Sequence, residues 1–263
     1  MATALRLAAS MLCLQASIGA VNDLADAEVD RVGKPAKPIP AGLVSRSGAR
    51  GWAGVTLAAG VALAAPSGIG AVAIAVLGVG LGYAYDVRLS RTSLAWLPLA
   101  LALPLLPVFA WLGATGHIPN ALGALIPAAV AAGTGLIMGN GLVDIERDRL
   151  AGKATIAVRL GRDRAWSLHG LAFVAAIAIA YALAPALPGP DGTGERLTTL
   201  VGLASAAGLP AGAVVIAVGA ALLTSVDAGV RERGWELEGI GTVVLGIGWL
   251  ARIAATSAGG LGG

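Results

Sequence analysis

The sequence predicts an all-α protein, a polytopic transmembrane helical bundle with about eight spans. Hydrophobic residues make up 57% of the 263 positions and charged residues only 13%, whereas an ordinary soluble domain carries about 25% charged residues. The mean hydropathy of +0.81 indicates a chain whose solvent is lipid. The 39 glycines agree with this, because small residues let transmembrane helices approach closely.

Each span needs about 20 apolar residues to cross roughly 30 Å of hydrocarbon. Runs of suitable length and composition lie at residues 3–22, 49–66, 68–85, 92–113, 121–140, 165–187, 198–223 and 239–256. The turn residues Pro66-Ser67-Gly68 predict that the second and third runs form a hairpin. Three prolines predict a kink in the fourth run, namely Pro98, Pro104 and Pro107.

Basic residues predict the orientation. The loops after the first, third, fifth and seventh runs hold all of the 18 Lys and Arg residues except Arg6, Arg196 and Arg252. By the positive-inside rule these loops face the cytoplasm, which puts the N-terminus outside. The basic residues are spread over short loops and do not form one patch. The sequence therefore predicts a multi-pass cell-membrane protein in contact with membrane lipid, with no nucleic acid among its partners.

Two acidic motifs share the pattern N-x-x-x-D-x-x-x-D-R at the cytoplasmic ends of runs. Their members are Asn22, Asp26 and Asp30 in the first motif, and Asn140, Asp144 and Asp148 in the second. Spacing of four places each set on one helical stripe, with members about 40° apart in projection. Two such ladders of hard oxygen atoms facing each other suit Mg²⁺, which prefers a few carboxylates completed by water and substrate phosphates. These six residues are the predicted metal ligands.

A single acidic stripe at a helix end is more often a solvated face. The functional interpretation prevails here because the motif occurs twice, each time with an asparagine deeper in the apolar run. Carboxylates at a helix C-terminus also oppose the helix dipole. Four runs accompany each motif, so we expect one integral-membrane domain over residues 1–263, built from repeats at about 1–117 and 118–263.

Basic residues follow both motifs and predict a polyanionic ligand such as a diphosphate. The predicted diphosphate contacts are Arg31, Lys34, Lys37, Arg88, Arg91, Arg149, Lys153 and Arg159. The prolines after the first motif predict an extended loop there. Tyr85 and Asp86 stand beside Arg88 in the third loop and would help to wall the pocket. The alternative, that the cations only set topology and the tyrosine is a membrane-belt residue, stays open.

These residues resemble the UbiA prenyltransferase superfamily over nearly the whole chain. The family's first motif, N-D-x-x-D-x-x-x-D, is matched by Asn22, Asp23, Asp26 and Asp30, and its D-x-x-x-D motif by Asp144 and Asp148. The Lys-Pro-Ala-Lys-Pro-Ile-Pro-Ala-Gly, Ala-Val-Arg-Leu-Gly and Tyr-Asp-Val-Arg-Leu stretches are similar as well. A lysine is common in the family at the position of Ser90, and Arg88 or Arg91 would replace it here.

The resemblance implies nine helices around a central cavity that opens sideways to lipid. It implies that Mg²⁺ bridges the acidic motifs to a prenyl diphosphate, and that a lipophilic acceptor captures the allylic carbocation. Asp23, Asp86 and Tyr85 are then the catalytic candidates, as groups that assist the carbocation or accept the proton. The family's first motif ends its second helix, while Asn22 ends the first run here. We therefore expect that this chain lacks the family's first helix.

Other functions remain open at this stage. A membrane transporter of a divalent cation or a phosphorylated solute would also contain repeats and intramembrane acids, but it would place its site near the midplane. Among acceptors, family prevalence favours a phenolic or quinone-precursor compound over a glycerol-phosphate lipid or a chlorin. The prenyl chain length and the oligomeric state are not predicted.

The orientation is testable by cysteine labelling in intact cells, after removal of Cys13. Single cysteines at Ser45, Ser90 and Ser167 should be protected from a membrane-impermeant thiol reagent, because they lie in or beside the predicted cytoplasmic loops. A cysteine at Thr193, in a predicted outer loop, should react. The opposite labelling pattern would contradict the orientation and put the acidic motifs outside the cell.

Overall fold

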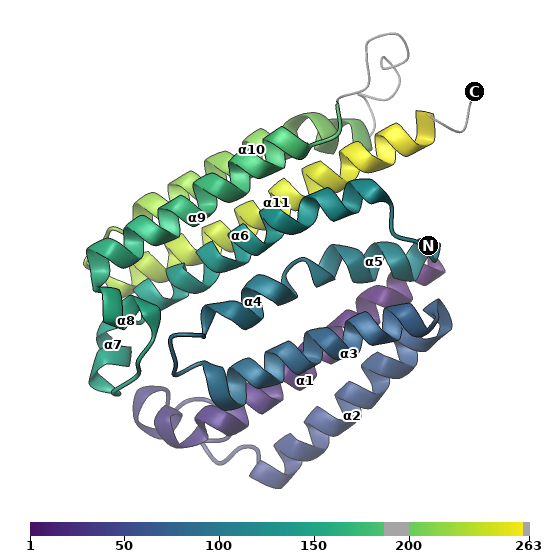
Figure 1. The fold of residues 1–263 in the computed structure, drawn as a ribbon. Helices are drawn as coiled ribbons and strands as arrows, with labels where there is room; N and C mark the ends of the chain where they lie inside the picture. The colour runs from purple at the N-terminus through teal and green to yellow at the C-terminus, as the bar shows by residue number, and fades with distance from the viewer. Residues whose placement is uncertain (187–199, 260–263) are drawn as a thin grey trace. The chain divides into compact units, whose positions relative to one another are not determined.

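The computed structural model of the chain describes residues 1–186 and 200–259, the last four by backbone alone. Within these ranges the chain is helical and contains no strand, which confirms the all-α fold class (Figure 1). Seven of the described helices or helix pairs are long and apolar enough to cross a membrane, and the protein is therefore an integral membrane protein. The contacts divide the chain into two compact units, Met1–Ile118 and Pro119–Gly263.

The first unit is built around its longest helix, α1 (Figure 1). Its elements are α1 (Ala2–Gly33), α2 (Arg46–Ala64), the 3₁₀ turn η1 (Ala65–Ser67), α3 (Ile69–Ala84), the π-helix η2 (Tyr85–Leu89), α4 (Trp96–Ala102) and α5 (Leu105–Thr115). α2, the expected run 49–66, packs along α1 but is not among the seven membrane-length apolar helices.

Hydroxyl groups hold α1 against α2. The buried Ser10 Oγ donates to the Gly60 carbonyl at 2.7 Å, and the buried Ser17 Oγ donates to the Ala53 carbonyl at 2.7 Å. Gly60 is needed at this contact, because a Cβ there would lie 2.6 Å from the Leu14 side chain. Interhelical hydrogen bonds and small residues are the usual means of joining helices in lipid.

Turn chemistry places the breaks where the sequence predicts them. The hairpin between α2 and α3 turns at Gly68, whose φ of 91° favours glycine. The predicted kink in the fourth run is an interruption between Ala102, where α4 ends, and Leu105, where α5 begins, and the two pieces together form one membrane-length span. The N-H that a proline lacks explains why the helix does not continue through this point.

The second unit contains four long helices that lie side by side, coloured from teal to yellow in Figure 1. Its described elements are α6 (Asn120–Val143), α7 (Ile145–Leu150), α8 (Ile156–Leu160), α9 (Arg162–Leu183), α10 (Leu200–Leu222) and α11 (Ala228–Gly259). The end of the sixth expected run, the start of the seventh and Thr193 lie outside the described residues.

Glycines bring α10 and α11 into direct backbone contact. A Cβ on Gly208 would lie 2.4 Å from the Gly248 Cα, and a Cβ on Gly219 would lie 2.5 Å from the Gly234 carbonyl oxygen. Real Cβ contacts are never so short, so only glycine fits at these positions. Close approach of this kind gains van der Waals packing, which drives helix association where lipid removes the hydrophobic effect.

A polar pair joins α9 to α11 in the interior of the second unit. His169 Nε2 lies 2.7 Å from Glu238 Oε1, and both side chains are fully buried. Neither atom has another hydrogen-bond partner within the described residues. The ring of Phe173 meets His169 edge to face, with 5.2 Å between centroids. Because these atoms have no access to water, each depends on the other.

Removing one member of this pair should destabilise the second unit. Glu238→Ala leaves the buried imidazole without a partner, which costs about 1–3 kcal/mol and should lower the thermal unfolding temperature in detergent. Glu236→Ala, an exposed carboxylate on the same helix, is the matched control and should leave that temperature unchanged. Equal unfolding temperatures for the two variants would mean that the pair contributes nothing.

Candidate active site

The first acidic motif lies at the C-terminal end of α1, which continues without a break to Gly33. The predicted stripe of Asn22, Asp26 and Asp30 is therefore present on one helix. Asp30 is buried, and its Oδ2 takes part in an ion pair. The Lys37 ammonium lies 2.7 Å from this oxygen and 2.8 Å from Asp23 Oδ1. One lysine thus bridges two motif carboxylates.

Lys37 reaches the motif because its loop folds back on α1. The sequence predicts an extended loop, and this expectation is wrong: the Ala41 N-H donates to the Lys37 carbonyl at 2.9 Å, and the Leu43 N-H donates to the Pro38 carbonyl at 2.9 Å. Burial alone would lower the pKa of the Lys37 ammonium, but its hydrogen bonds and charge interactions with Asp23 and Asp30 raise the pKa above its usual value. Lys37 therefore stays protonated beside the motif.

Asp86 meets the same motif from the π-helix η2. Asn22 Nδ2 donates to Asp86 Oδ1 at 2.9 Å, and the Asp86 side chain is buried with Oδ2 unpartnered among the described residues. Single-turn π-helices are frequent at functional sites, because they turn a side chain that a regular helix would point elsewhere. The bond fixes the Asn22 amide nitrogen on Asp86 and leaves the amide oxygen for another partner. Tyr85, half-buried, begins the same turn.

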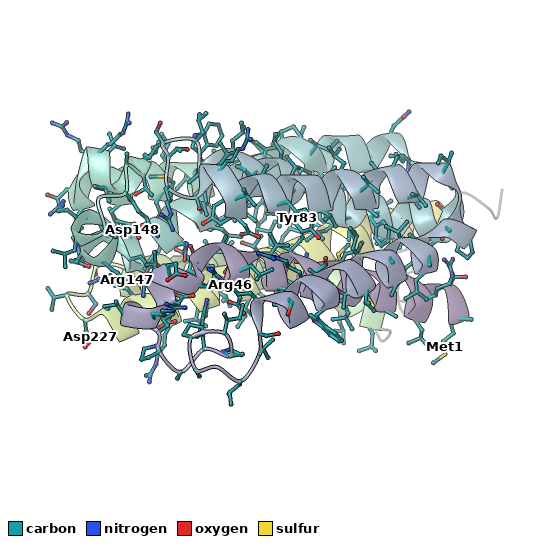
Figure 2. The ribbon with its side chains drawn as sticks, turned by 90° about the horizontal axis from the view of Figure 1, so that it is seen from below. Met1, Arg46, Tyr83, Arg147, Asp148 and Asp227 are labelled. Carbon is teal, nitrogen blue, oxygen red and sulfur yellow. The ribbon has the colours of Figure 1, made fainter. Side chains whose placement is uncertain are left out.

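The other predicted cations of the first unit lie at its surface. Arg91 approaches Asp26 at 3.7 Å, and Arg31 pairs with Glu28 at 3.3 Å. Lys34 and Arg88 are exposed. Tyr83, which lies between Arg46 and Met1 in Figure 2, hydrogen bonds Ser17 at 2.7 Å and so belongs to the helix packing.

The second acidic motif does not form one continuous helix. α6 ends at Val143 and α7 begins at Ile145, with Asp144 at the bend. The expectation of an unbroken stripe is therefore wrong here, although hydrogen bonds of helical spacing remain: Asp144 N-H to the Asn140 carbonyl at 3.2 Å and Asp148 N-H to the Asp144 carbonyl at 2.8 Å. Asp148 and Arg147 lie at the same end of the second unit as Asp227 (Figure 2).

Lysine pairs with the last aspartate of the second motif, as it does in the first. Lys153 Nζ lies 2.9 Å from Asp148 Oδ1, a buried oxygen with no other partner within the described ranges. Arg147 contacts Asp144 at 2.5 Å. The remaining predicted cations, Arg149 and Arg159, are exposed, and Asn140 is half-buried. Both motifs therefore end in a buried carboxylate that, among the described residues, is paired with a lysine.

The donor set fits a hard divalent cation. All candidate ligands offer oxygen, and each motif holds one buried carboxylate oxygen that pairs with a lysine and has no further partner within the described residues. Within the described residues no three acidic or histidine side chains converge on one point. Such sparse protein ligation suits Mg²⁺, which retains waters and takes phosphate oxygens from its substrate.

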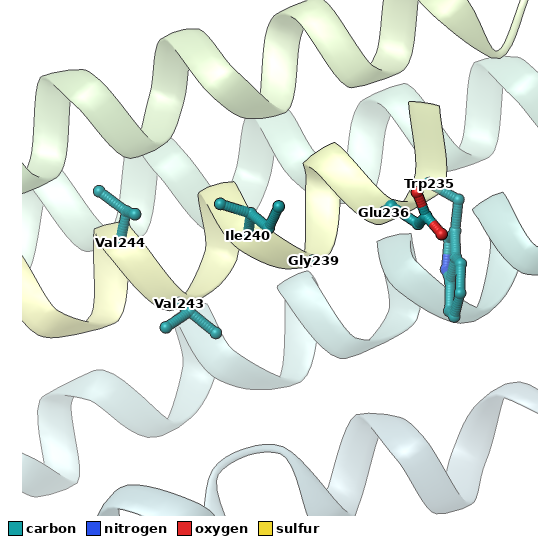
Figure 3. Close-up of a pocket in the computed structure, with 6 residues that line it drawn as sticks. All are labelled: Trp235, Glu236, Gly239, Ile240, Val243 and Val244. Atoms are coloured by element: carbon teal, nitrogen blue, oxygen red, sulfur yellow. The ribbon is translucent and has the colours of Figure 1, made fainter. Parts of the chain in front are cut away.

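An apolar groove of about 600 Å³ lies on α11 (Figure 3). Trp235 and Glu236 stand at one end of it, and Ile240 and Val243 line its length. Trp235 is fixed by a hydrogen bond of 2.9 Å from its Nε1 to the Leu136 carbonyl of α6. The surface of the groove suits hydrocarbon.

Sequence reasoning missed three charged residues of the second unit. Arg162 and Arg231 counted only as cations that set orientation, and Glu146 only as part of the acidic cluster. Arg231 is instead fully buried and contacts Glu146 at 2.6 Å, while Arg162 contacts Glu146 at 3.3 Å. The available signal was the position of Glu146, two residues from each motif aspartate and hence off their stripe.

Comparison with known proteins now identifies the family. The model of the UbiA prenyltransferase family matches residues 1–235. A digeranylgeranylglyceryl phosphate synthase of Methanopyrus kandleri is 33% identical over 86% of this chain and 78% of its own length. The synthase of Methanoculleus marisnigri is 38% identical over 34% of this chain, but the match spans only 32% of that protein.

Solved structures share the fold. A UbiA homolog from Aeropyrum pernix K1 superposes with a TM-score of 0.74 at 20% identity, covering 96% of this chain and 90% of that one. A UbiA homolog from Archaeoglobus fulgidus, bound to GPP and Mg²⁺, gives a TM-score of 0.64 at 17% identity over 95% and 87% of the two chains. The resemblance found in the sequence is confirmed, and this membrane-embedded chain belongs to the UbiA prenyltransferase family.

Proposed function

We propose that the chain transfers an isoprenyl group from a prenyl diphosphate to a lipophilic acceptor, with Mg²⁺ as cofactor and with the reaction on the cytoplasmic side of the membrane. The observation that carries this proposal is the repeated arrangement of a buried motif aspartate with a lysine at its oxygen, Asp30 with Lys37 and Asp148 with Lys153. Carboxylates and cations alternate in this way where metal ions and a polyanion are to be held together.

Each motif has a definite role in this proposal. Asn22, Asp26 and Asp30 of the first motif, and Asn140, Asp144 and Asp148 of the second, would each hold Mg²⁺ for the diphosphate. The metal, when bound, stabilises the charge that develops on the departing diphosphate. The hydrogen bond from Asn22 to Asp86 supports this role, because it directs the asparagine oxygen away from Asp86 and toward a ligand position.

The cations would neutralise the diphosphate. Lys37 and Lys153 already lie at the motif carboxylates, and Arg91 lies near Asp26. These cations therefore already lie beside the carboxylates that would hold the metal. The exposed cations would add charge at the entrance; they are Arg31, Lys34, Arg88, Arg149 and Arg159.

Two carboxylates remain for proton transfer. Asp86 has one buried oxygen without a partner among the described residues, while Asp23 is engaged by Lys37. Asp86 is thus the better candidate for accepting the proton that the acceptor loses when its oxygen or carbon bonds to the isoprenyl group. Tyr85, the preceding residue, would assist the allylic carbocation through its electron-rich ring.

The acceptor that the relatives favour is a glyceryl phosphate lipid. The names of the relatives describe a synthase of a glyceryl phosphate that carries two geranylgeranyl groups. A glyceryl phosphate with one prenyl chain would therefore receive the second chain here, in place of the phenolic or quinone-precursor acceptor expected from the sequence. The groove on α11 supports an acceptor with a long hydrocarbon chain, because its lining is almost entirely apolar.

A panel assay tests the reaction and its acceptor. Purified protein with Mg²⁺ and labelled geranylgeranyl diphosphate should transfer label to a monoprenylated glyceryl phosphate in preference to a phenolic acid. Excess EDTA should abolish the transfer, and added Mg²⁺ should restore it, because the diphosphate cannot depart without charge neutralisation. Transport of Mg²⁺ or diphosphate into protein-containing vesicles, with no transfer to either acceptor, would favour the transporter.

Substitution of the motif aspartates tests the metal site. Asp26→Ala and Asp144→Ala should each lower turnover at least about a hundredfold, the order found when one stabiliser of a developing negative charge is removed. Both proteins should still reach the membrane and unfold at the wild-type temperature. Glu28→Ala is the control, because Glu28 is an exposed carboxylate on the same turn of α1. Near-normal turnover of either aspartate variant at saturating Mg²⁺ would contradict the two-motif site.

A further inference from the structure

Three charged side chains of the second unit form a connected cluster beside the second acidic motif. They are Glu146 on α7, Arg162 at the start of α9 and Arg231 on α11. We call this cluster the arginine clasp. The function proposed above gives none of the three a role, because none of them belongs to the predicted metal ligands or diphosphate contacts.

The two arginines contact different oxygens of the Glu146 carboxylate. Arg231 donates to Glu146 Oε2 at 2.6 Å, and Arg162 donates to Glu146 Oε1 at 3.3 Å. Both oxygens of one carboxylate are thus engaged by guanidinium groups from two different membrane helices. Hydrogen bonds between charged partners of this kind are shorter and stronger than neutral ones.

The same arginines also hold the ends of neighbouring helices. Arg231 donates to the Val143 carbonyl at 3.1 Å and to the Val226 carbonyl at 2.9 Å. Both arginines donate to the Ser225 carbonyl, in the connection between α10 and α11. Val143 is the last residue of α6, where helix carbonyls lack partners inside the helix. The clasp therefore ties α6, α7, α9 and the α10–α11 connection to one another.

The burial of Arg231 shows that it does more than set the orientation of the chain in the membrane. The residue is 1% exposed, and an arginine that marks a cytoplasmic loop needs only to lie in water. Taking a guanidinium out of water is costly unless its hydrogen bonds are satisfied. Four hydrogen bonds from its two terminal nitrogens meet most of that requirement, while its Nε has no hydrogen-bond partner within the described residues.

The position of these bonds points to the metal-binding motif. Arg231 contacts the carbonyl of the residue directly before Asp144 and the carboxylate of Glu146, midway between Asp144 and Asp148. Asp144 is the bend between α6 and α7. One guanidinium nitrogen thus spans the bend and fixes the angle at which Asp144 and Asp148 are presented.

We propose that Arg231 is a positioning residue of the second acidic motif, acting through Glu146 and the Val143 carbonyl to hold Asp144 and Asp148 in register for a divalent cation. The inference rests on the proposed function for its ligand. Arg162 supports it from α9, which keeps Glu146 in place when the lysine and arginine side chains around the motif rearrange.

Four variants in the full-length, detergent-purified protein test the inference. Arg231→Met removes the spanning guanidinium, and Arg231→Lys keeps its charge but can reach fewer of its partners. Glu146→Gln removes the clasped charge from a side chain that is itself exposed. Arg233→Met is the matched control, an exposed arginine two residues along the same helix.

Two readouts other than transferase activity are measured. Manganese(II) alone, followed by electron paramagnetic resonance, should bind about tenfold or more weakly to Arg231→Met and Glu146→Gln, the usual effect of losing a residue that orients a metal ligand. Deuterium exchange of the backbone amides of 144–150 should quicken in both variants. Arg231→Lys should give intermediate values, and Arg233→Met should match the wild type.

The outcomes separate this inference from the proposed function. Wild-type exchange at 144–150 in both Arg231→Met and Glu146→Gln would overturn the clasp, whatever the enzyme does. So would a lowered unfolding temperature with unchanged manganese affinity and unchanged exchange, because Arg231 would then only support the fold. If the wild type itself neither transfers prenyl groups nor binds manganese, the proposed function fails, while the exchange comparison still decides whether Arg231 holds the bend.

Discussion

Hydrocarbon cannot form hydrogen bonds, and this constraint governs the buried polar atoms of the part of the chain that the structure describes. Backbone groups must be satisfied within helices, so the described chain is helical wherever it is apolar. Side-chain donors inside the units find carbonyls of neighbouring helices, as Ser10 does at Gly60 and Trp249 at Ala180. Each bond that satisfies a polar atom also joins two helices, so the same contacts that make burial tolerable assemble the bundle.

The same constraint separates the basic residues into three groups with different surroundings. Exposed arginines such as Arg88 remain in water, where they suffice to orient the chain. Lys37 and Lys153 fold back onto motif carboxylates. Arg231 is buried, and it donates hydrogen bonds to the end of a neighbouring helix. A count of positive charge in loops treats these residues alike, although their surroundings make them chemically different.

Much of the fold was predictable because it follows from local rules. Composition and run length predict the helices. Gly68 predicts the hairpin turn, and Pro104 predicts the interruption between α4 and α5. The two acidic motifs were visible because spacing of four is a property of a single helix. These features need no knowledge of which helices are neighbours.

The remaining features depend on contacts between distant parts of the chain. His169 meets Glu238, and Glu146 meets Arg231, only after helices have packed. The π-helix at Tyr85–Leu89 and the bend at Asp144 are departures from regular geometry that spacing alone does not reveal. The loop that carries Lys37 was judged extended from its prolines, whereas its backbone bonds fold it into turns. The residue types at the candidate site could therefore be predicted from the sequence, but the partners of their side chains could not.

The backbone contact between α10 and α11 has a consequence for how sequence change is tolerated. At Gly208 and Gly248 the two helices touch through their main-chain atoms, so a changed side chain elsewhere cannot relieve a clash at this point. A replacement at either position separates the helices and shifts α11, which carries both Glu238 and Arg231, away from its partners. Substitutions are therefore best tolerated on the outward-facing sides of α10 and α11, while two residues without side chains hold the geometry of the polar ones.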